Sequence, residues 1–182
     1  MADQFPSIDN RLQTFIEAQQ MFFVGSAAPD GRVNVSPKGM DSLRVMGPNR
    51  ILWLNVTGSG NETAGHLLRA NRMTLMWCSF GIKPMILRCY GTARTVHRHD
   101  ADWNDMVAHF PEHLGARQVY DVSVELVQTS CGYAVPRMEF QAERDTLTKW
   151  TADKGADGVA DYWDTRNRQT IDGFPTGVLD DA

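Results

Sequence analysis

Long apolar segments are absent from this chain of 182 residues. No apolar run approaches the roughly 20 residues that a membrane-spanning helix needs, so the sequence predicts no contact with a membrane. Basic blocks are absent too, because the 18 Lys and Arg residues are scattered along the chain. With a formal net charge of −4 and a pI near 5.7, the chain lacks the electrostatic signature of a nucleic-acid-binding protein. We therefore expect neither DNA, RNA nor a membrane as a partner.

Cysteine is scarce, and Cys78, Cys89 and Cys131 lie far apart in the sequence. Each stands in an apolar, strand-like context, which favours buried reduced thiols over a redox or metal site. The N-terminus also lacks the basic and apolar regions of a secretion signal. These features predict a cytoplasmic protein without a bound metal.

The composition that is present, 42% hydrophobic and 22% charged residues, is ordinary for a globular protein. The length allows one domain with a sizeable core. No internal repeat and no low-complexity linker divides the chain. We therefore interpret residues 1–182 as a single domain with a C-terminal helical extension at about residues 147–182.

Most of the chain has the pattern of short strands joined by tight turns. Alternation or apolar character, bounded by turn residues, predicts strands in two hairpins and three later segments. Hairpins make antiparallel pairs, so the sequence favours a mainly β (α+β) fold, an antiparallel barrel with peripheral helices. The expected strands are Phe22–Ala27 with Val33–Ser36, Leu43–Met46 with Ile51–Val56, and then Met73–Ser79, Met85–Val96 and Asp121–Leu126.

Helices are expected between and after these strands. Ser7 is the predicted cap of a first helix and Asp100 of a third, which Pro111 ends. An irregular tail follows from Ile171. The expected helices are Ile8–Gln19, Glu62 to about Ala70, Ala101–His109 and Ala156–Thr165.

The most informative segment is LNVTGSGNET, residues 54–63, where an apolar strand enters a glycine loop that opens a helix. Glycines let the backbone approach a ligand, and the free N–H groups and dipole of a helix start favour an anion. Upstream, Val33–Gly39 adds the hydroxyl of Ser36 and the cation of Lys38 near another strand end. Together the two segments predict a site for a phosphorylated ligand.

Three other interpretations of the glycine loop were weighed. It is not a Walker A loop, because no Gly-Lys-Ser/Thr follows the glycines. It matches a dinucleotide fingerprint only in part, since Thr63 stands where the third glycine would be. For the loop alone, an ordinary turn with Asn61 as helix cap is the simplest alternative.

The order and spacing of several motifs resemble the pyridoxamine 5′-phosphate oxidase-related family. The similarity covers residues 10–140 well and the tail more loosely. Two of the motifs, Cys131–Pro136 and Ile171–Pro175, resemble stretches found in one branch of the family. The other motifs are Asp30–Gly39, Asn55–Thr63, His66–Met73 and Tyr90–Arg94.

The resemblance implies an antiparallel six-stranded split β-barrel that binds FMN at the interface of a homodimer. By the same resemblance, one strand lines the flavin, Asn55 faces the ring system, and the helix start surrounds the ribityl phosphate. Backbone N–H groups, hydroxyls and one cation suit a phosphate dianion. The implied FMN-binding residues are Val35, Ser36, Pro37, Lys38, Asn55, Ser59, Gly60, Asn61, Glu62 and Thr63.

Departures from the family pattern bear on the activity. The vitamin B6 oxidases place basic residues where this chain has Asn61, Glu62 and Thr63, and their C-terminal arginine signature is missing here. We therefore expect a flavin-dependent oxidoreductase acting on another small molecule, with no catalytic acid or base identified. The alternatives are a non-catalytic flavin- or haem-binding module, with His66 or His97 and His99 as axial-ligand candidates, or a deazaflavin-dependent reductase.

Overall fold

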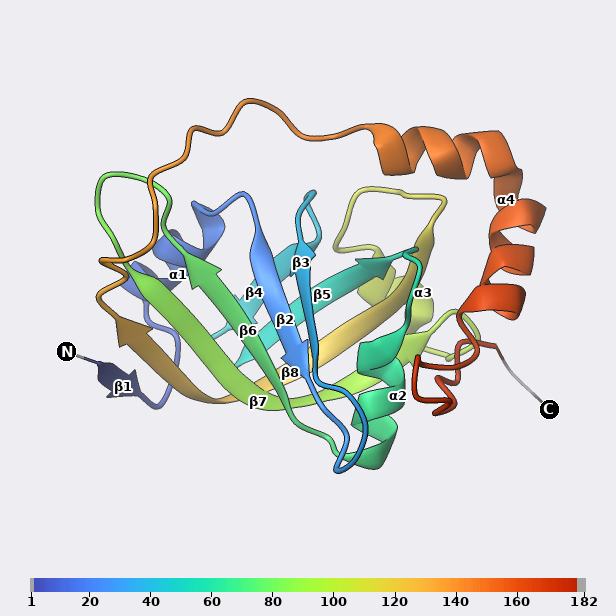
Figure 1. Cartoon of the computed structure of the whole chain (residues 1–182), viewed down its shortest axis with the longest axis horizontal. Coiled ribbons are helices and arrows are strands. Elements are labelled where there is room, and N and C mark those ends of the chain that lie inside the picture. The colour runs from blue at the N-terminus through green and yellow to red at the C-terminus, as the bar shows by residue number, and fades with distance from the viewer. Residues whose placement is uncertain (1, 180–182) are drawn as a thin grey trace.

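The computed structural model describes residues 2–179 and contains one antiparallel sheet of eight strands in that range (Figure 1). Seven strands follow the order β3-β2-β6-β7-β8-β5-β4, and β1 pairs with β8. The sheet stays open between its edge strands β3 and β4. The strands are β1 (Asp3–Phe5), β2 (Phe22–Ser26), β3 (Asn34–Lys38), β4 (Leu43–Gly47), β5 (Arg50–Val56), β6 (Met73–Cys78), β7 (Ile86–His97) and β8 (Ala116–Ser130).

The predicted mainly β class with peripheral helices is confirmed, with eight strands in place of six. Both predicted hairpins are present, as the antiparallel pairs β2–β3 and β4–β5. Strand β1 was not predicted, because three residues are too few to show a period. Residues 1 and 180–182, the ends of the predicted single domain, lie outside the described residues, and the division into domains stays a prediction.

Four helices in the described range surround the sheet: α1 (Asn10–Glu17), α2 (Glu62–Arg69), α3 (Trp103–Val107) and α4 (Thr146–Arg166). The predicted cap of α1, Ser7, is wrong, because the Asp9 carboxylate accepts the Leu12 backbone N–H at 2.7 Å. The predicted cap of α3 is also wrong, because Asp100 accepts the backbone N–H of His97 instead. None of these helices is both long and apolar enough to cross a membrane.

Strand β8 lies at the centre of the sheet and pairs with β7, β5 and β1. It begins at Ala116, five residues before the predicted start at Asp121. Residues 116–120 are all buried, so this part lacks the polar–apolar alternation that identified the rest of the strand. The missed segment carries Arg117, which contributes to the cavity described below.

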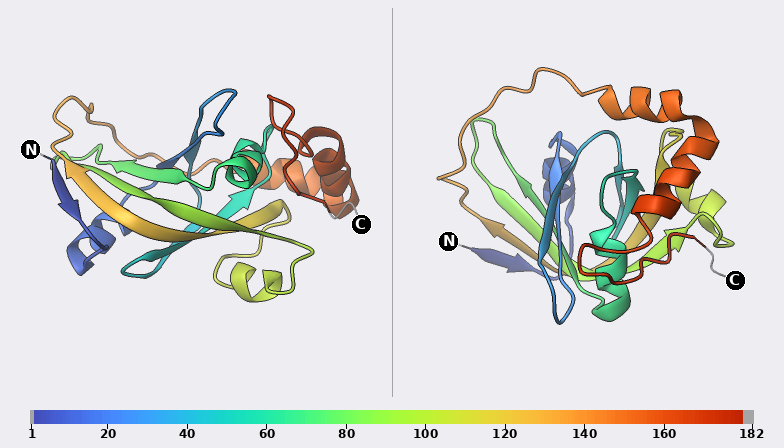
Figure 2. Two further views of the ribbon diagram at one scale, coloured as in Figure 1. Left: turned by 90° about the horizontal axis from the view of Figure 1, so that it is seen from below. Right: turned by 45° about the vertical axis from the view of Figure 1, so that its right-hand side comes forward.

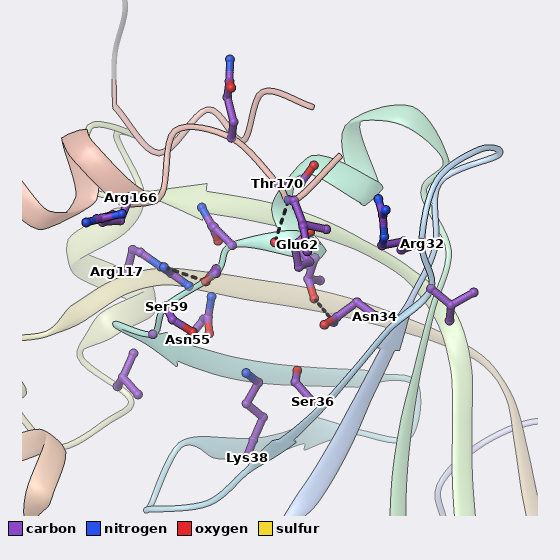
Figure 3. Close-up of a pocket in the computed structure, with 18 of the residues that line it drawn as sticks. Arg32, Asn34, Ser36, Lys38, Asn55, Ser59, Glu62, Arg117, Arg166 and Thr170 are labelled. Atoms are coloured by element: carbon purple, nitrogen blue, oxygen red, sulfur yellow. Dashed lines mark hydrogen bonds between the residues drawn. The ribbon is translucent and has the colours of Figure 1, made fainter. Parts of the chain in front are cut away.

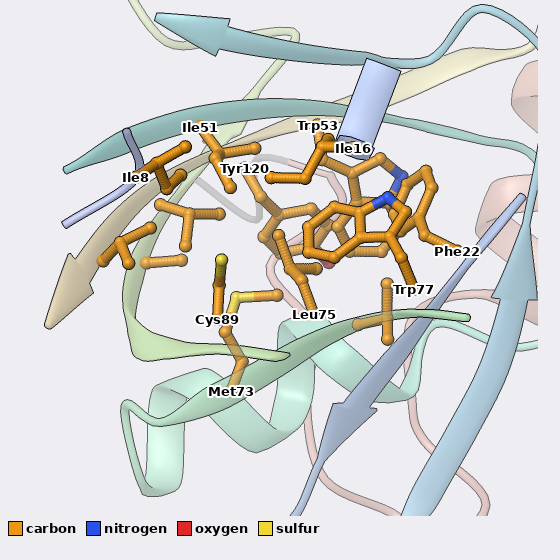
Figure 4. Close-up of a cluster of buried hydrophobic side chains, with 14 of the residues drawn as sticks. Ile8, Ile16, Phe22, Ile51, Trp53, Met73, Leu75, Trp77, Cys89 and Tyr120 are labelled. Atoms are coloured by element: carbon orange, nitrogen blue, oxygen red, sulfur yellow. The ribbon is translucent and has the colours of Figure 1, made fainter. Parts of the chain in front are cut away.

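The main core fills the concave side of the sheet beneath α1 (Figure 4). Trp53 of β5 stacks on Tyr120 of β8 with ring centroids 4.5 Å apart, and Phe22 contacts both Trp53 and Trp77. Aromatic pairs at such distances stabilise a core beyond their buried area. The core therefore fixes β5 and β8 relative to one another, and these two strands carry part of the site.

Helix α4 and the residues after it, 167–179, which we call the tail from here on, lie at one end of the sheet, beside α2 (Figure 2). The helix bends at Gly155, whose φ of 68° is left-handed and suits glycine. Buried Val159, Trp163 and Val178 form a small cluster there, and the Trp163 indole N–H donates to Thr57 Oγ1 at 2.8 Å. This bond joins the C-terminal segment to the end of β5, where the glycine loop begins.

A substitution at Gly91 tests how β7 packs against β8, the two longest strands. A Cβ at this position would lie 1.9 Å from the carbonyl oxygen of Ser123, at an irregularity in the β7–β8 register. We expect Gly91→Ala to lower the free energy of unfolding by about 1–3 kcal/mol, measured by urea denaturation. Gly81→Ala is the control, because its nearest neighbour would be an ordinary 3.7 Å away. Equal stability of the two variants would contradict this packing.

Candidate functional site

A cavity of about 710 Å³ opens between β3, β5, the start of α2 and the C-terminal segment (Figure 3). Its volume lies within the range usual for small-molecule sites. The glycine loop, residues 57–61, borders it together with the first turn of α2. The wall is completed by Arg117 from β8 and by Arg166, Gln169, Thr170 and Ile171.

Strand β3 presents alternate side chains to this cavity. Asn34, Ser36 and Lys38 line it, and Figure 3 shows Ser36 and Lys38 pointing inward from the strand. Val35 and Pro37, which the resemblance also placed at the cofactor, do not line it, because successive side chains of a strand face opposite sides. Val35 instead faces outward and is 66% exposed.

Strands β5 and β8 form the floor. Asn55 of β5 is buried and donates to the side-chain oxygen of Gln118 on β8 at 3.1 Å. The Lys38 ammonium lies 5.4 Å from the centre of the Trp53 ring, within the range of a cation–π contact. Polar groups thus stand beside an aromatic floor, an arrangement that suits a ligand with a flat, heteroatom-bearing ring.

The start of α2 is built to receive an anion. Asn61 occupies the N-cap position, but its side chain makes no capping hydrogen bond, and its buried Oδ1 has no partner. The first N–H groups of a helix have no partner within the helix, so without a side-chain cap they are open to a ligand. Asn61 therefore stands at the predicted cap position of α2 but does not cap the helix through its side chain.

Glu62, the one acidic side chain among residues 2–179 that lines the cavity, is held by the tail. Both of its carboxylate oxygens accept the backbone N–H of Ile171, at 3.1 and 3.2 Å. Thr63, in the first turn of α2, accepts a hydrogen bond from the Ser26 hydroxyl of β2 at 3.3 Å. The carboxylate is thus occupied by the C-terminal segment and is paired with no cation of the described chain.

Arg117 is the functional residue that sequence reasoning missed. It is only 3% exposed, and its Nη1 donates to the Gly60 carbonyl at 3.1 Å and to Asn167 Oδ1 at 2.6 Å, while Nε has no partner. No salt bridge of residues 2–179 gives Arg117 or Lys38 a carboxylate. Burial lowers the pKa of Arg117 to about 10. Burial, and then the charge of Arg117, lower the pKa of Lys38 to about 8.

These two cations decide what the cavity can hold. A buried charge is stable only when paired and hydrogen-bonded, and here two positive charges repel one another across one space. An anion between them and the start of α2 would relieve both costs. The donors present, namely two cations, N–H groups and hydroxyls, fit a phosphate monoester.

Asn167 joins the tail to the glycine loop and to Arg117. It is fully buried, and besides accepting from Arg117 it donates to the Gly58 carbonyl at 3.2 Å. Its own carbonyl accepts from Thr176 at 2.6 Å and from Asn61 at 3.4 Å. The Asn167 side chain therefore joins two parts of the cavity wall, Gly58 and Arg117, and its backbone carbonyl contacts a third, Asn61.

The tail also packs directly on α2. A Cβ at Gly65 would lie 2.4 Å from Thr170 Cγ2, so only glycine allows this approach without a shift. Thr170 and Ile171 thereby reach the cavity. The sequence offered no signal for this contact, because the tail lacks a hydrophobic period.

Eight of the ten predicted residues line the cavity, all except Val35 and Pro37. The axial-ligand candidates do not: His66 is buried against Ser26 at 3.0 Å, and His97 stacks on His99. No group of three or more metal-ligating side chains occurs in residues 2–179. Wall residues that were not predicted are Arg32, Val33, Asn34, Trp53, Val56, Gly58, Arg117, Arg166, Gln169, Thr170 and Ile171.

The open antiparallel sheet with its peripheral helices is a split β-barrel. Residues 8–131 match the model of the pyridoxamine 5′-phosphate oxidase family. The chain is 30% identical to the pyridoxamine 5′-phosphate oxidase family protein ustO of Aspergillus flavus, over 94% of this chain and 76% of that protein. The chain therefore belongs to the pyridoxamine 5′-phosphate oxidase family.

Two solved structures share the fold. A variant of the Group A Streptococcus protein HupZ aligns with a TM-score of 0.55 at 16% identity, over 68% of this chain and 99% of that one. A candidate pyridoxamine 5′-phosphate oxidase of Lactobacillus delbrueckii aligns with a TM-score of 0.53 at 19% identity, over 68% and 94%. The family match ends at residue 131, so the tail that closes the cavity lies outside it.

Asn167→Ala tests the role of the tail in building this wall. The change removes the partners of the Gly58 carbonyl and of the Arg117 guanidinium. We expect the free energy of unfolding to fall by about 1–3 kcal/mol, because a buried polar group is left unsatisfied. Asn104→Ala, at an exposed position of α3, is the matched control for urea denaturation. A loss no larger than that of the control would contradict the role given to Asn167.

Proposed function

We propose that this cavity binds FMN, with the phosphate at the start of α2 and the flavin ring toward β3 and β5. The observation that carries the proposal is a pair of cations, the buried Arg117 and the half-buried Lys38, that face one cavity without a carboxylate partner in residues 2–179. Membership of the family, together with the uncapped helix start, supports the same assignment.

Within this proposal each wall segment has a distinct role. The N–H groups of the first turn of α2 and the hydroxyls of Ser59 and Thr63 hold the phosphate, and Arg117 neutralises its charge. Asn55, oriented by Gln118, offers an amide to the polar edge of the ring. Lys38 places a proton-carrying amine between the Trp53 ring and the cavity.

We further propose an oxidoreductase that acts on a small molecule. When bound, the flavin would supply the redox chemistry by accepting a hydride. The protein would hold the cofactor, exclude water and keep a proton available at Lys38 Nζ, whose pKa of about 8 lies near neutrality. Vitamin B6 phosphate is not the proposed substrate, because the tail lacks the arginine signature of the B6 oxidases.

Haem receives less weight than flavin. An axial ligand would be a His, Cys, Met or Tyr, and none of these lines the cavity within the described chain. A homodimer with the cofactor at its interface remains part of the proposal, supported by exposed Val35 on the edge strand β3 and exposed Val33 just before it. The free thiols Cys78, Cys89 and Cys131 support a cytoplasmic location.

Titration of FMN into the apoprotein tests the proposal. We expect Lys38→Met to weaken FMN binding by about 10- to 100-fold, because a hydrogen bond to a charged group is lost. Lys83→Met, in an exposed turn, is the matched control and should bind as the unaltered protein does.

The same titration at rising pH adds a second readout. Since an anion raises the pKa of Lys38 above about 8, affinity should fall by up to about tenfold per pH unit above that value.

The slope should be absent in Lys38→Met, because that variant has no amine to titrate. Arg117, with a pKa of about 10, stays mostly charged as the pH rises above 8 toward that value. It therefore contributes equally to FMN binding in the unaltered protein and in Lys38→Met. FMN affinity that is equal in the two proteins, or equally pH-dependent in both, would contradict the assignment of Lys38.

A further inference from the structure

A second cavity, of about 620 Å³, lies on the other side of Lys38. It is enclosed by the end of β3, the segment before β2, and the strap, which we define as residues 131–145 between β8 and α4. Figure 1 shows the strap crossing from the end of β8 to α4 along the edge of the molecule. The start of α4 forms the remaining wall.

The wall of this cavity is largely apolar. Its apolar side chains are Met21, Pro37, Met40, Phe140, Ala142, Leu147 and Trp150. Methionine and aromatic side chains adapt to flat, apolar ligands. The wall therefore suits the body of a small aromatic molecule better than it suits a sugar or a peptide.

Met40 has an unusual backbone at this place. Its φ of 59° is left-handed, and no other non-glycine residue in residues 2–179 has a positive φ. Such a conformation is uncommon for a residue with a side chain, and strained residues cluster at functional sites. Here the strain turns the chain between β3 and β4 so that Met40 lines the second cavity.

Lys38 belongs to the walls of both cavities. It is therefore the point at which a molecule in the second cavity meets the proposed cofactor site. Its ammonium carries three donors, so it can serve a ligand on each side. The other charged groups of the second cavity, Glu143 and Arg144, are exposed residues of the strap with opposite charge. Because Glu143 and Arg144 carry opposite charges, the inner end of the cavity keeps the positive charge of Lys38.

We propose that the second cavity is the substrate site and that it takes a small aromatic acid, with the ring against Met40, Leu147 and Trp150 and the carboxylate or phenolate at Lys38. This inference rests on the proposed function, because Lys38 joins the substrate to the flavin only if the first cavity holds FMN. Phe140, Leu147 and Trp150 lie beyond residues 8–131, which the family model matches, and within the 94% of this chain that aligns with ustO. The site is accordingly a feature of the C-terminal segment of this chain.

Calorimetric titration of naphthoate into the FMN-loaded protein tests the site, with naphthalenemethanol as the uncharged analogue. Leu147→Trp fills the cavity from α4, and Met138→Trp places the same side chain at an exposed strap position outside the wall. Met21→Trp fills the cavity from the opposite side and replaces Leu147→Trp should that variant not fold. FMN titration and sedimentation of each variant accompany the measurement.

We expect Leu147→Trp to weaken naphthoate binding by about tenfold or more, and the uncharged analogue to bind the unaltered protein about tenfold more weakly than naphthoate. Met138→Trp should leave naphthoate binding unchanged, and all variants should bind FMN equally. Absence of naphthoate binding, or equal binding by Leu147→Trp, would overturn the proposal. A change in oligomeric state confined to Leu147→Trp would also overturn it, because a second copy of the chain would then cover the cavity. Failure to bind FMN, by contrast, would count against the first cavity, and titration of the apoprotein would still test the second.

Discussion

The site depends on one costly arrangement, the burial of the Arg117 guanidinium without a carboxylate. Neutral oxygens of Gly60 and Asn167 satisfy part of its hydrogen-bonding capacity, and the rest faces a cavity that Lys38 also enters. A buried and a half-buried cation in one space favour an anion there. The glycine loop, the uncapped start of α2 and the tail are all positioned around this charge. The fold, the tail and the proposed cofactor site are therefore energetically coupled.

The part of the fold that follows a local period could be predicted from the sequence. The two hairpins, β6 and β7 follow from alternation and turn residues, and the glycine loop indicated the anion site. Arg117 could not be found, because residues 116–120 are buried on both faces of β8 and show no alternation. Val35 and Pro37 were assigned as part of a contiguous motif, whereas the period of two in a strand separates them from Ser36 and Lys38.

The contribution of the tail could not be predicted either, for a different reason. Asn167, Thr170 and Ile171 act through single hydrogen bonds and close packing on α2, and such contacts leave no pattern in the sequence. These residues also lie outside residues 8–131, which the family shares. A common barrel thus provides the phosphate end of the site, while the C-terminal segment closes it and forms the wall of the second cavity. Variation in that segment is a simple means for one fold to serve different substrates.

The absorbance spectrum of the purified protein, with the released cofactor identified by mass, tests the central claim most directly. We expect the two bands of an oxidised flavin in the visible and near-ultraviolet region, and the mass of FMN in the released fraction. A haem spectrum, a deazaflavin mass, or a colourless protein that also fails to take up added FMN would contradict it.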